Sequence, residues 1–258
     1  MLMAVVLCFS VVSVASAQDS SIGVICNGRA ISFDVNPQIV NGRTLVPMRK
    51  IFEEMGATVN YDASSKTITA KKGEKVVAMK VGSTTISVSG TASTIDVAPT
   101  IIDSRTLVPV RAVSESLNAT VEWNDALHKV IIFDWDNITK TVPYETCAAI
   151  PDFGKYVGLD SSVDGPSAGG NHFLVNYSYA NLLGTNKLSI LEDYKKVLEK
   201  NGFQLDDTIT SDVNFGPAYV KSEEDESNYY TVGLPTDLNS DNFIVSITYK
   251  YAAATDTE

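Results

Sequence analysis

The first half of the chain carries two periodic patterns of apolar residues in succession. Four apolar residues have the spacing i, i+3, i+4 and i+7: Met48, Ile51, Phe52 and Met55. This spacing predicts a helix with one buried face. Alternation with a period of two follows in Thr58–Tyr61 and Thr67–Thr69, which predicts two short antiparallel strands around a turn.

The same succession returns 62 residues later. The heptapeptide RTLVPMR at Arg43–Arg49 recurs as RTLVPVR at Arg105–Arg111, and the offset holds without a gap from Val24/Ile86 to Ala70/Ile132. A fixed period is typical of a duplicated structural unit. The second copy therefore predicts its own helix, followed by strands at 120–123 and 129–132.

Turn-forming residues stand where each predicted helix begins and ends. Pro47 and Pro109 suit the first helical position, because proline has a fixed φ and its missing N–H would have no partner there. Gly56 and Asn118 suit the end, where a left-handed residue is common. Alternation in 75–81 and 85–88, around a Gly-Ser turn, predicts a hairpin that fuses the two copies into one module at residues 22–138.

The positions that are identical in the two copies are turn formers, a charge pair and apolar strand residues. They include Gly28/Gly90, Asp34/Asp96, Pro37/Pro99, Pro47/Pro109, Arg49/Arg111, Glu53/Glu115 and the run at 57–59/119–121. An exposed i, i+4 charge pair is worth only a few tenths of a kcal/mol. We therefore expect the doubled segment to serve architecture. One enclosed hollow lined by polar side chains of both copies would contradict this.

These residues resemble a known family. The sequences NGRTLVPMRKIFEEMGATVNYD…KTITA and DSRTLVPVRAVSESLNATVEWND…KVIIF are similar to the copper amine oxidase-like N-terminal (stalk) domain of secreted bacterial proteins, over about residues 22–135. The resemblance implies a small antiparallel sheet wrapped on a helix, attached to other extracellular domains. It also implies a domain that does not itself hold copper.

The second half begins with a connector. Residues 139–170 are rich in proline and glycine, which predicts a partly ordered segment. Phe153 lies within it, and we expect this apolar stretch to dock on a neighbouring domain.

A second domain, residues 171–252, has the pattern β-α-β-β-β. A strand at 173–179 precedes a helix that begins at a capping box of Ser189 and Glu192 and ends at Gly202. Three further strands are predicted at Ala218–Lys221, Tyr229–Leu234 and Phe243–Tyr251. The fold class is therefore α+β, with a helix packed on an antiparallel sheet.

Residues 1–17 are apolar and end in Ala-Ser-Ala before Gln18, a pattern typical of a secretory signal peptide. A retained membrane anchor is the alternative, although the stretch is short for a span. We expect an extracellular or cell-surface protein with no membrane span in the mature chain.

The net charge of −11 is unevenly distributed. Residues 18–147 hold 13 Lys and Arg against 14 Asp and Glu, whereas residues 148–258 hold 7 against 17. Such an acidic half repels polyanions, so nucleic acid and anionic lipid are not expected partners.

Oxidase chemistry does not follow from the family name. Copper–quinone catalysis needs three histidine ligands, and the chain has only His128 and His172. His128 replaces Lys66 of the first copy at a turn, which predicts a solvated side chain. Tyr61 stands in the place of Trp123, which predicts a core position. No cofactor is expected.

The mature chain would keep two cysteines, Cys26 and Cys147. A disulfide is permitted outside the cell, but Cys26 corresponds to Val88 and this favours two buried or idle thiols. Cys147 with His172 makes a weak nucleophile pair, because Cys147 lacks basic neighbours that would lower its pKa. Two loops, Asp237–Asp241 and Asp160–Gly165, resemble calcium loops but lack essential ligands. No catalytic or metal residue is assigned.

Ten of the eleven tyrosines follow residue 143, and only Tyr61 precedes it. Tyr177, Tyr179, Tyr194 and Tyr249 either pack the sheet against the helix or form an exposed row that binds a glycan or peptide. The primary expectation is a non-catalytic scaffold or spacer whose partner is a cell-wall polymer, a glycan or an extracellular protein. A polysaccharide hydrolase with carboxylates around Glu192, Glu223 or Asp241 is the other alternative. Ligand-binding residues are not assigned.

Overall fold

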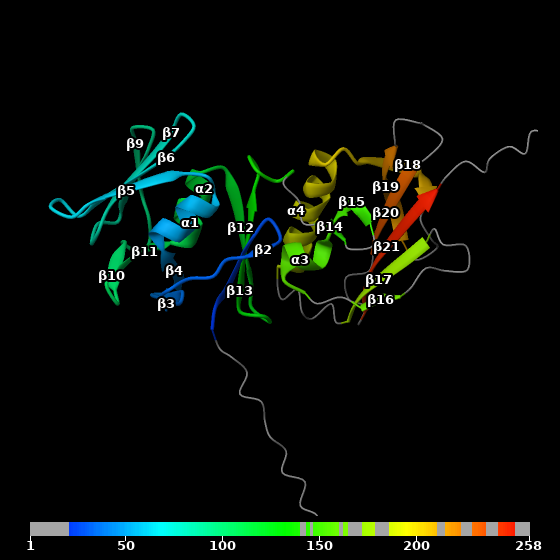
Figure 1. The fold of residues 1–258 in the computed structure, drawn as a ribbon, viewed down its shortest axis with the longest axis horizontal. Helices are drawn as coiled ribbons and strands as arrows, with labels where there is room; N and C mark the ends of the chain where they lie inside the picture. The colour runs from blue at the N-terminus through cyan, green and yellow to red at the C-terminus, as the bar shows by residue number, and fades with distance from the viewer. Residues whose placement is uncertain are drawn as a thin grey trace, which may run out of the picture.

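The computed structural model describes residues 21–139, 143–144, 147–159, 162–164, 172–178, 186–210, 215–222, 229–235 and 242–250. Within them the N-terminal module and a second unit lie side by side (Figure 1). The predicted signal peptide lies outside the described residues. The predicted domain limits remain a prediction.

The elements of the first copy recur in the second. The first copy comprises β1 (Gly23–Cys26), β2 (Arg29–Ala30), β3 (Gln38–Val40), β4 (Arg43–Pro47), α1 (Met48–Glu54), β5 (Thr58–Asp62) and β6 (Thr67–Lys72). The strand β7 (Lys75–Lys80) leads to β8 (Thr85–Val88), β9 (Thr91–Thr94), β10 (Thr100–Ile102), β11 (Arg105–Pro109), α2 (Val110–Ser116), β12 (Ala119–Asn124) and β13 (Lys129–Asp134).

The two copies are interlocked, because each of the three sheets of the module takes strands from both. The strand orders are β5-β6-β7-β8-β9, β12-β13-β1-β2 and β10-β11-β4-β3. In the last sheet β4 runs antiparallel to β11, with Val46 opposite Val108. Since these two valines are 62 residues apart and equivalent, an approximate twofold axis passes between them.

The helices pack as the apolar pattern predicts. Ile51, Phe52 and Met55 are fully buried, and Met48 is nearly so. The helix ends where Gly56 takes a φ of +73°, and Asn118 takes +68° at the equivalent place. A left-handed residue at these positions ends the helix in each copy.

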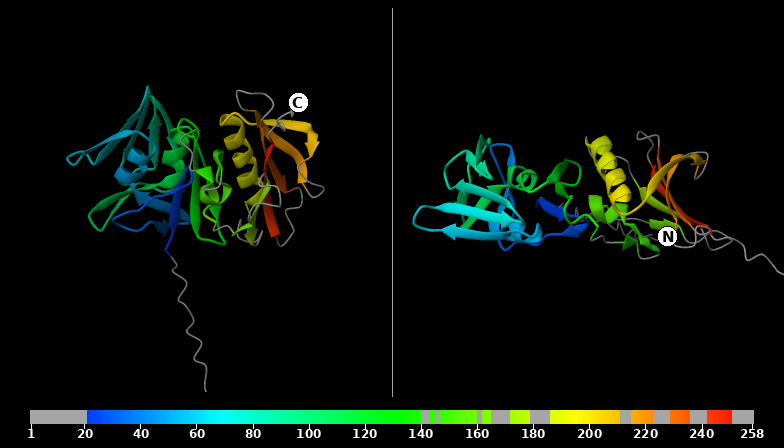
Figure 2. Two further views of the ribbon diagram at one scale, coloured as in Figure 1. Left: turned by 45° about the vertical axis from the view of Figure 1, so that its right-hand side comes forward. Right: turned by 90° about the horizontal axis from the view of Figure 1, so that it is seen from above.

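The sheet of β12, β13, β1 and β2 is covered on both faces. Val130 and Ile132 face the core of the module. Ile131 and Phe133 enter a second core with α3 (Phe153–Val157) and α4 (Lys187–Lys200). Successive residues of a strand point to opposite faces, so this unbroken apolar run joins the module to the second unit (Figure 2).

The second unit consists of α3, α4 and eight strands of the described residues. Its strands are β14 (Pro143–Tyr144), β15 (Cys147–Pro151), β16 (Ser162–Asp164), β17 (His172–Ser178), β18 (Gln204–Thr210), β19 (Phe215–Ser222), β20 (Tyr229–Pro235) and β21 (Asn242–Lys250). Six form an antiparallel sheet in the order β16-β17-β21-β20-β19-β18. Mixed strands with few helices agree with the α+β class.

The predicted β-α-β-β-β order was incomplete, because β18 and β16 are additional strands. Both lie at the edges of the six-stranded sheet. The sequence of β18, QLDDTIT, has little apolar alternation, and Leu205 within it is 52% exposed. An edge strand that does not bury a full face lacks the pattern by which strands are found.

The predicted capping box was wrong. The helix α4 begins at Lys187, and Asn186 is its N-cap residue without a side-chain cap. The Ser189 hydroxyl instead donates to Glu122 of the module, and Glu192 pairs with Lys195. The Ser189 hydroxyl therefore bonds to the N-terminal module, whereas the local sequence pattern predicts a bond to the backbone of the helix.

The segment around Phe153 docks as expected. Asp152 caps α3 by accepting from the Lys155 backbone N–H at 3.1 Å, and Phe153 is fully buried in the second core. The helix ends at Gly158 with a φ of +74°. Within the described ranges, no helix combines the length and apolar character that crossing a membrane requires.

Candidate functional site

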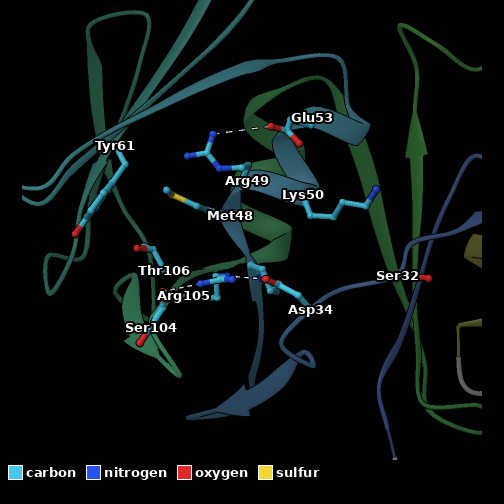
Figure 3. Close-up of a pocket in the computed structure, with 11 residues that line it drawn as sticks. Ser32, Asp34, Met48, Arg49, Lys50, Glu53, Tyr61, Ser104, Arg105 and Thr106 are labelled. Atoms are coloured by element: carbon cyan, nitrogen blue, oxygen red, sulfur yellow. Dashed lines mark hydrogen bonds and ion pairs between the residues drawn. The ribbon is translucent and has the colours of Figure 1, made fainter.

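The module carries two grooves built from equivalent residues. The Tyr61 groove has a volume of about 570 Å³ and is lined by Asp34, Met48, Arg49, Tyr61, Arg105 and Thr106 among others (Figure 3). The Trp123 groove has a volume of about 620 Å³ and is lined by Asp96, Val110, Arg111, Trp123, Arg43 and Thr44 among others. Each residue of the first set is 62 positions from its counterpart in the second.

Both copies contribute to each groove. In the Tyr61 groove, Arg49 comes from the first turn of α1 and Tyr61 from β5, whereas Arg105 comes from β11 of the other copy. Pro47 fixes the junction of β4 and α1, with a φ of −55°, and thereby places Arg49 at the rim. The groove exists only because the copies interlock.

Two ion pairs beside the grooves join the two copies. Arg105 Nε lies 2.6 Å from Asp34 Oδ2, and Arg43 Nη2 lies 2.5 Å from Asp96 Oδ2. Each arginine thus pairs with the aspartate of the other copy. The hydrogen bond from the Arg105 side chain lowers the pKa of Asp34 below its usual value. The pair holds one guanidinium in a fixed position in each groove.

A second guanidinium in each groove is held only loosely. Arg49 lies 4.0 Å from Glu53 and Arg111 lies 3.9 Å from Glu115, and their side chains are 64% and 54% exposed. Within the described part of the chain these two arginines have no hydrogen-bonded partner at shorter range. Their N–H donors are therefore exposed beside the grooves and are not committed to a short hydrogen bond within the described residues.

Each groove has one aromatic wall. Tyr61 and Trp123 are half-buried and pack against the module core, while also lining the grooves. The prediction that Tyr61 is a core residue was therefore half right. Its place on β5, an edge strand of its sheet, leaves part of the ring outside the core.

The guanidinium groups are the polar chemistry that the grooves offer to a ligand. Three cationic residues line the Tyr61 groove against two carboxylates, but one of the three, Lys50, is bound to Glu54 at 2.5 Å. The Trp123 groove has two cationic residues and two carboxylates. Asp34 is already bound to Arg105, and Glu122 at the Trp123 groove already accepts from Asn186 at 2.9 Å. Since Arg105 and Arg43 are themselves held by aspartates, Arg49 and Arg111 are the guanidinium groups left for a ligand.

The grooves bear on the expectation that the doubled residues are purely architectural. Polar side chains of both copies do converge. They form two hollows open to solvent along one side, and neither is the single enclosed hollow that would have contradicted the expectation. Sequence reasoning missed the grooves, since it could not show that Arg105 faces Asp34. The shared Asp, Arg and aromatic positions of the two copies were the available clue.

Of the thiol and histidine candidates, the structure describes the side chains of Cys26 and His128. Cys26 is a free, buried thiol, so the disulfide with Cys147 is not formed, and burial raises the pKa of Cys26 to about 12. His128 is exposed at a turn, as predicted. The side chains of Cys147 and His172 lie outside the described residues.

The remaining candidates lie in the second unit. Glu192 is bound to Lys195 at 2.6 Å. Tyr194 is fully buried and its hydroxyl donates to the Pro151 carbonyl at 2.6 Å, so it belongs to the core. Eight further predictions concern residues or side chains outside the described part: Glu223, Asp241, Tyr177, Tyr179, Tyr249, Asp160, Asp237 and Asn239. Among the residues that the structure describes, no three His, Cys, Asp or Glu side chains are grouped to hold a metal.

Comparison with known proteins agrees with this assignment of architecture. Residues 25–132 match the family described as "Copper amine oxidase N-terminal domain", which is a non-catalytic domain family. The match spans both copies and both grooves. A search of curated proteins finds no match.

Proposed function

From the match of residues 25–132 to the copper amine oxidase N-terminal domain, we propose that the protein is a non-catalytic scaffold, secreted or displayed at the cell surface. The duplicated module forms one end of this scaffold and the α+β unit the other. Binding of partners, and not turnover of a substrate, is its task.

The shared core carries the proposal. Ile131 and Phe133 of the module are fully buried in one cluster with residues of α3 and α4. Burying a Phe side chain contributes about 1.5 to 3 kcal/mol. A scaffold must hold its ends at a fixed distance. A hydrophobic core shared by the module and the second unit does this.

Polar contacts support the same junction. Glu122 accepts hydrogen bonds from Asn186 and Ser189 at the start of α4. Lys129 Nζ donates to the Gly158 carbonyl at 2.5 Å. Lys196 lies over the Trp135 ring, 5.7 Å from its centroid. These contacts hold α3 and α4 against the sheet of β12 and β13.

Hydrogen exchange tests the single rigid body. With rising urea, amides of β6 and of α4 are expected to lose protection at the same denaturant concentration in the wild type. Phe133→Ala should separate the two transitions, with α4 opening first, because it removes shared core. Independent opening of α4 in the wild type would refute the fixed spacer.

Localisation needs a separate test. Expression of the full chain in a Gram-positive host should place the protein in the medium or on the cell wall, with Gln18 as its first residue by mass spectrometry. Retention of residues 1–17 on protein in the cytoplasmic fraction would contradict secretion.

The two alternatives from the sequence have less support. Tyr194 is removed from the tyrosine row, since it is buried. Glu192, the described carboxylate of the hydrolase hypothesis, forms an ion pair with Lys195 on α4. The observation that favours binding lies instead in the grooves of the module.

A further inference from the structure

We propose that the Tyr61 and Trp123 grooves are two equivalent binding sites for an extracellular glycan that carries carboxylate groups. The proposal rests on the proposed function, because such a polymer is met outside the cell. It assigns the interaction to the first half of the chain, where the sequence had pointed to the tyrosines of the second.

The first step is recognition of the carboxylate. Arg49 and Arg111 present guanidinium groups at the groove rims, more than half exposed and with ion-pair partners only at 4.0 and 3.9 Å. A guanidinium binds a carboxylate through two parallel hydrogen bonds, and such charge-assisted bonds are the strong ones. A ligand carboxylate therefore binds either arginine more strongly than the glutamate four residues later in the same helix does.

The second step is recognition of the sugar ring. Tyr61 and Trp123 form one wall of each groove. A rigid aromatic ring offers apolar contact area to the C–H face of a sugar while its polar atom stays hydrated. Thr106 and Thr44 supply hydroxyl groups at equivalent places in the two grooves. Aromatic face, guanidinium and hydroxyl together match an acidic sugar.

The two grooves keep the same charged residues although their apolar residues differ. Met48 corresponds to Val110 and Tyr61 to Trp123, yet the two arginines and the aspartate of each groove are identical. Exposed ion pairs of an arginine contribute only about 0 to 1 kcal/mol to folding. Stability alone therefore explains little of why Arg49 and Arg111 are the same.

The presence of two equivalent sites suits a ligand with a repeating structure. Two equivalent sites on one rigid module engage a polymer that presents the same group many times, and simultaneous binding raises avidity. An acidic peptide is the less suitable ligand. Arginine clusters also bind acidic peptides, but a run of acidic side chains offers no apolar ring face to the aromatic wall of each groove.

The acidic character of the chain does not oppose this ligand. The negative charge lies in residues 148–258, and residues 18–147 are nearly neutral, with 13 cationic against 14 anionic residues. The Tyr61 groove itself has three cationic residues against two carboxylates, and the Trp123 groove has two of each. Screening at physiological salt limits the reach of the remote charge to about 8 Å.

Isothermal titration of the purified mature chain against polygalacturonate tests the proposal, with methyl-esterified polygalacturonate as the uncharged polymer. Arg49→Ala with Arg111→Ala is expected to weaken binding by about tenfold or more, as for loss of charge-assisted hydrogen bonds. Each single variant should lose part of this, because one groove remains. Lys80→Ala, which removes an exposed charge outside both grooves, should bind as the wild type does.

Two further variant sets separate the contributions. Arg49→Lys with Arg111→Lys keeps the charges but loses the fork, and an intermediate affinity is expected. Tyr61→Leu with Trp123→Leu keeps an apolar residue against the core and should also weaken binding. Circular dichroism checks that each variant is folded. If the double alanine variant is unfolded, the double lysine variant takes its place as the test of the guanidinium groups.

Several results would overturn the proposal. They are equal binding of the esterified polymer, no binding by the wild type, wild-type affinity in the double alanine variant, and tighter binding of polyglutamate or dextran sulfate than of polygalacturonate. None of these bears on secretion or on the shared core, so the proposed function fails or stands by its own tests.

Discussion

Lys72 and Asp134 occupy equivalent positions in the two copies, and in the folded module they form an ion pair with each other. The Lys72 Nζ lies 2.8 Å from Asp134 Oδ1, and both side chains are almost buried, at 11% and 1% exposure. The approximate twofold axis therefore passes between them. Two identical copies would bring together two lysines or two aspartates here, so the fused chain depends on the difference between its halves.

Replacing Lys72 tests this pair. Lys72 also lies 3.0 Å from Asp136, so Lys72→Met leaves two carboxylates without their cation. We expect the free energy of unfolding to fall by about 3 kcal/mol, the usual cost of breaking a buried pair, as measured by urea denaturation. Lys80→Met, on the exposed end of β7, should change it by less than about 0.5 kcal/mol.

Exchanging the two charges is a sharper test of the symmetry. Lys72→Asp alone places like charges together and should destabilise more than Lys72→Met. Adding Asp134→Lys should recover part of the loss, since the positions are equivalent. Recovery will be incomplete, because Asn137 donates to Asp134 Oδ2 at 2.8 Å and cannot serve a lysine. Additive losses would show that the positions are not interchangeable.

The ion pair between Asp34 and Arg105 predicts how the Asp34 carboxyl responds to pH. The Arg105 side chain donates to Asp34 and lowers the pKa of that carboxyl. A lowered pKa means that its stabilising contribution is present above the unfolded pKa and is lost as the pH falls through the folded pKa. Carbon NMR should show the pKa of Asp34 rising in Arg105→Ala. The same pKa should stay in place in Arg43→Ala, which breaks the other pair.

Gly158 tests the docking of the connector on the module. A Cβ at this position would overlap Ile25 Cδ1 and lie 2.8 Å from Lys129 Cδ, and the φ of Gly158 is +74°. Gly90 has a φ of +89° with nothing within 4 Å. Gly90→Ala should therefore cost about 1 kcal/mol from backbone strain alone.

Gly158→Ala should cost about 1 to 3 kcal/mol more than Gly90→Ala, because overpacking adds to the strain. Thermal unfolding of both variants measures the difference. Equal costs would mean that the end of α3 does not press on β1 and β13.

Cys26 predicts the reactivity of a buried thiol. Burial raises its pKa from 9.0 to about 12. In a variant with Cys8 and Cys147 replaced by serine, Cys26 should react with a disulfide reagent at pH 8 only after unfolding. Its contribution to stability is complete below the unfolded pKa and is lost as the pH rises toward the folded one. Fast reaction of the folded protein would contradict the burial.

The helices, their ends and the strand pairs of each copy could be predicted from sequence because they depend on short-range rules. The spacing of Met48, Ile51, Phe52 and Met55 defines a buried face, and Gly56 accepts the left-handed φ that ends it. Edge strands such as β18 were missed, since they bury too little to show a pattern. The capping box at Ser189 failed because a residue of another unit, Glu122, took its hydroxyl.

The sequence by itself determined that a unit was doubled, that each copy has a helix and strands in a fixed order, and that the retained residues include few reactive groups. Only the tertiary structure decided that the copies interlock, that Arg105 meets Asp34 and Lys72 meets Asp134, and that two grooves result. The reason is physical: helices and hairpins follow from contacts a few residues apart. The grooves instead depend on contacts across 62 residues or more, which no local pattern encodes.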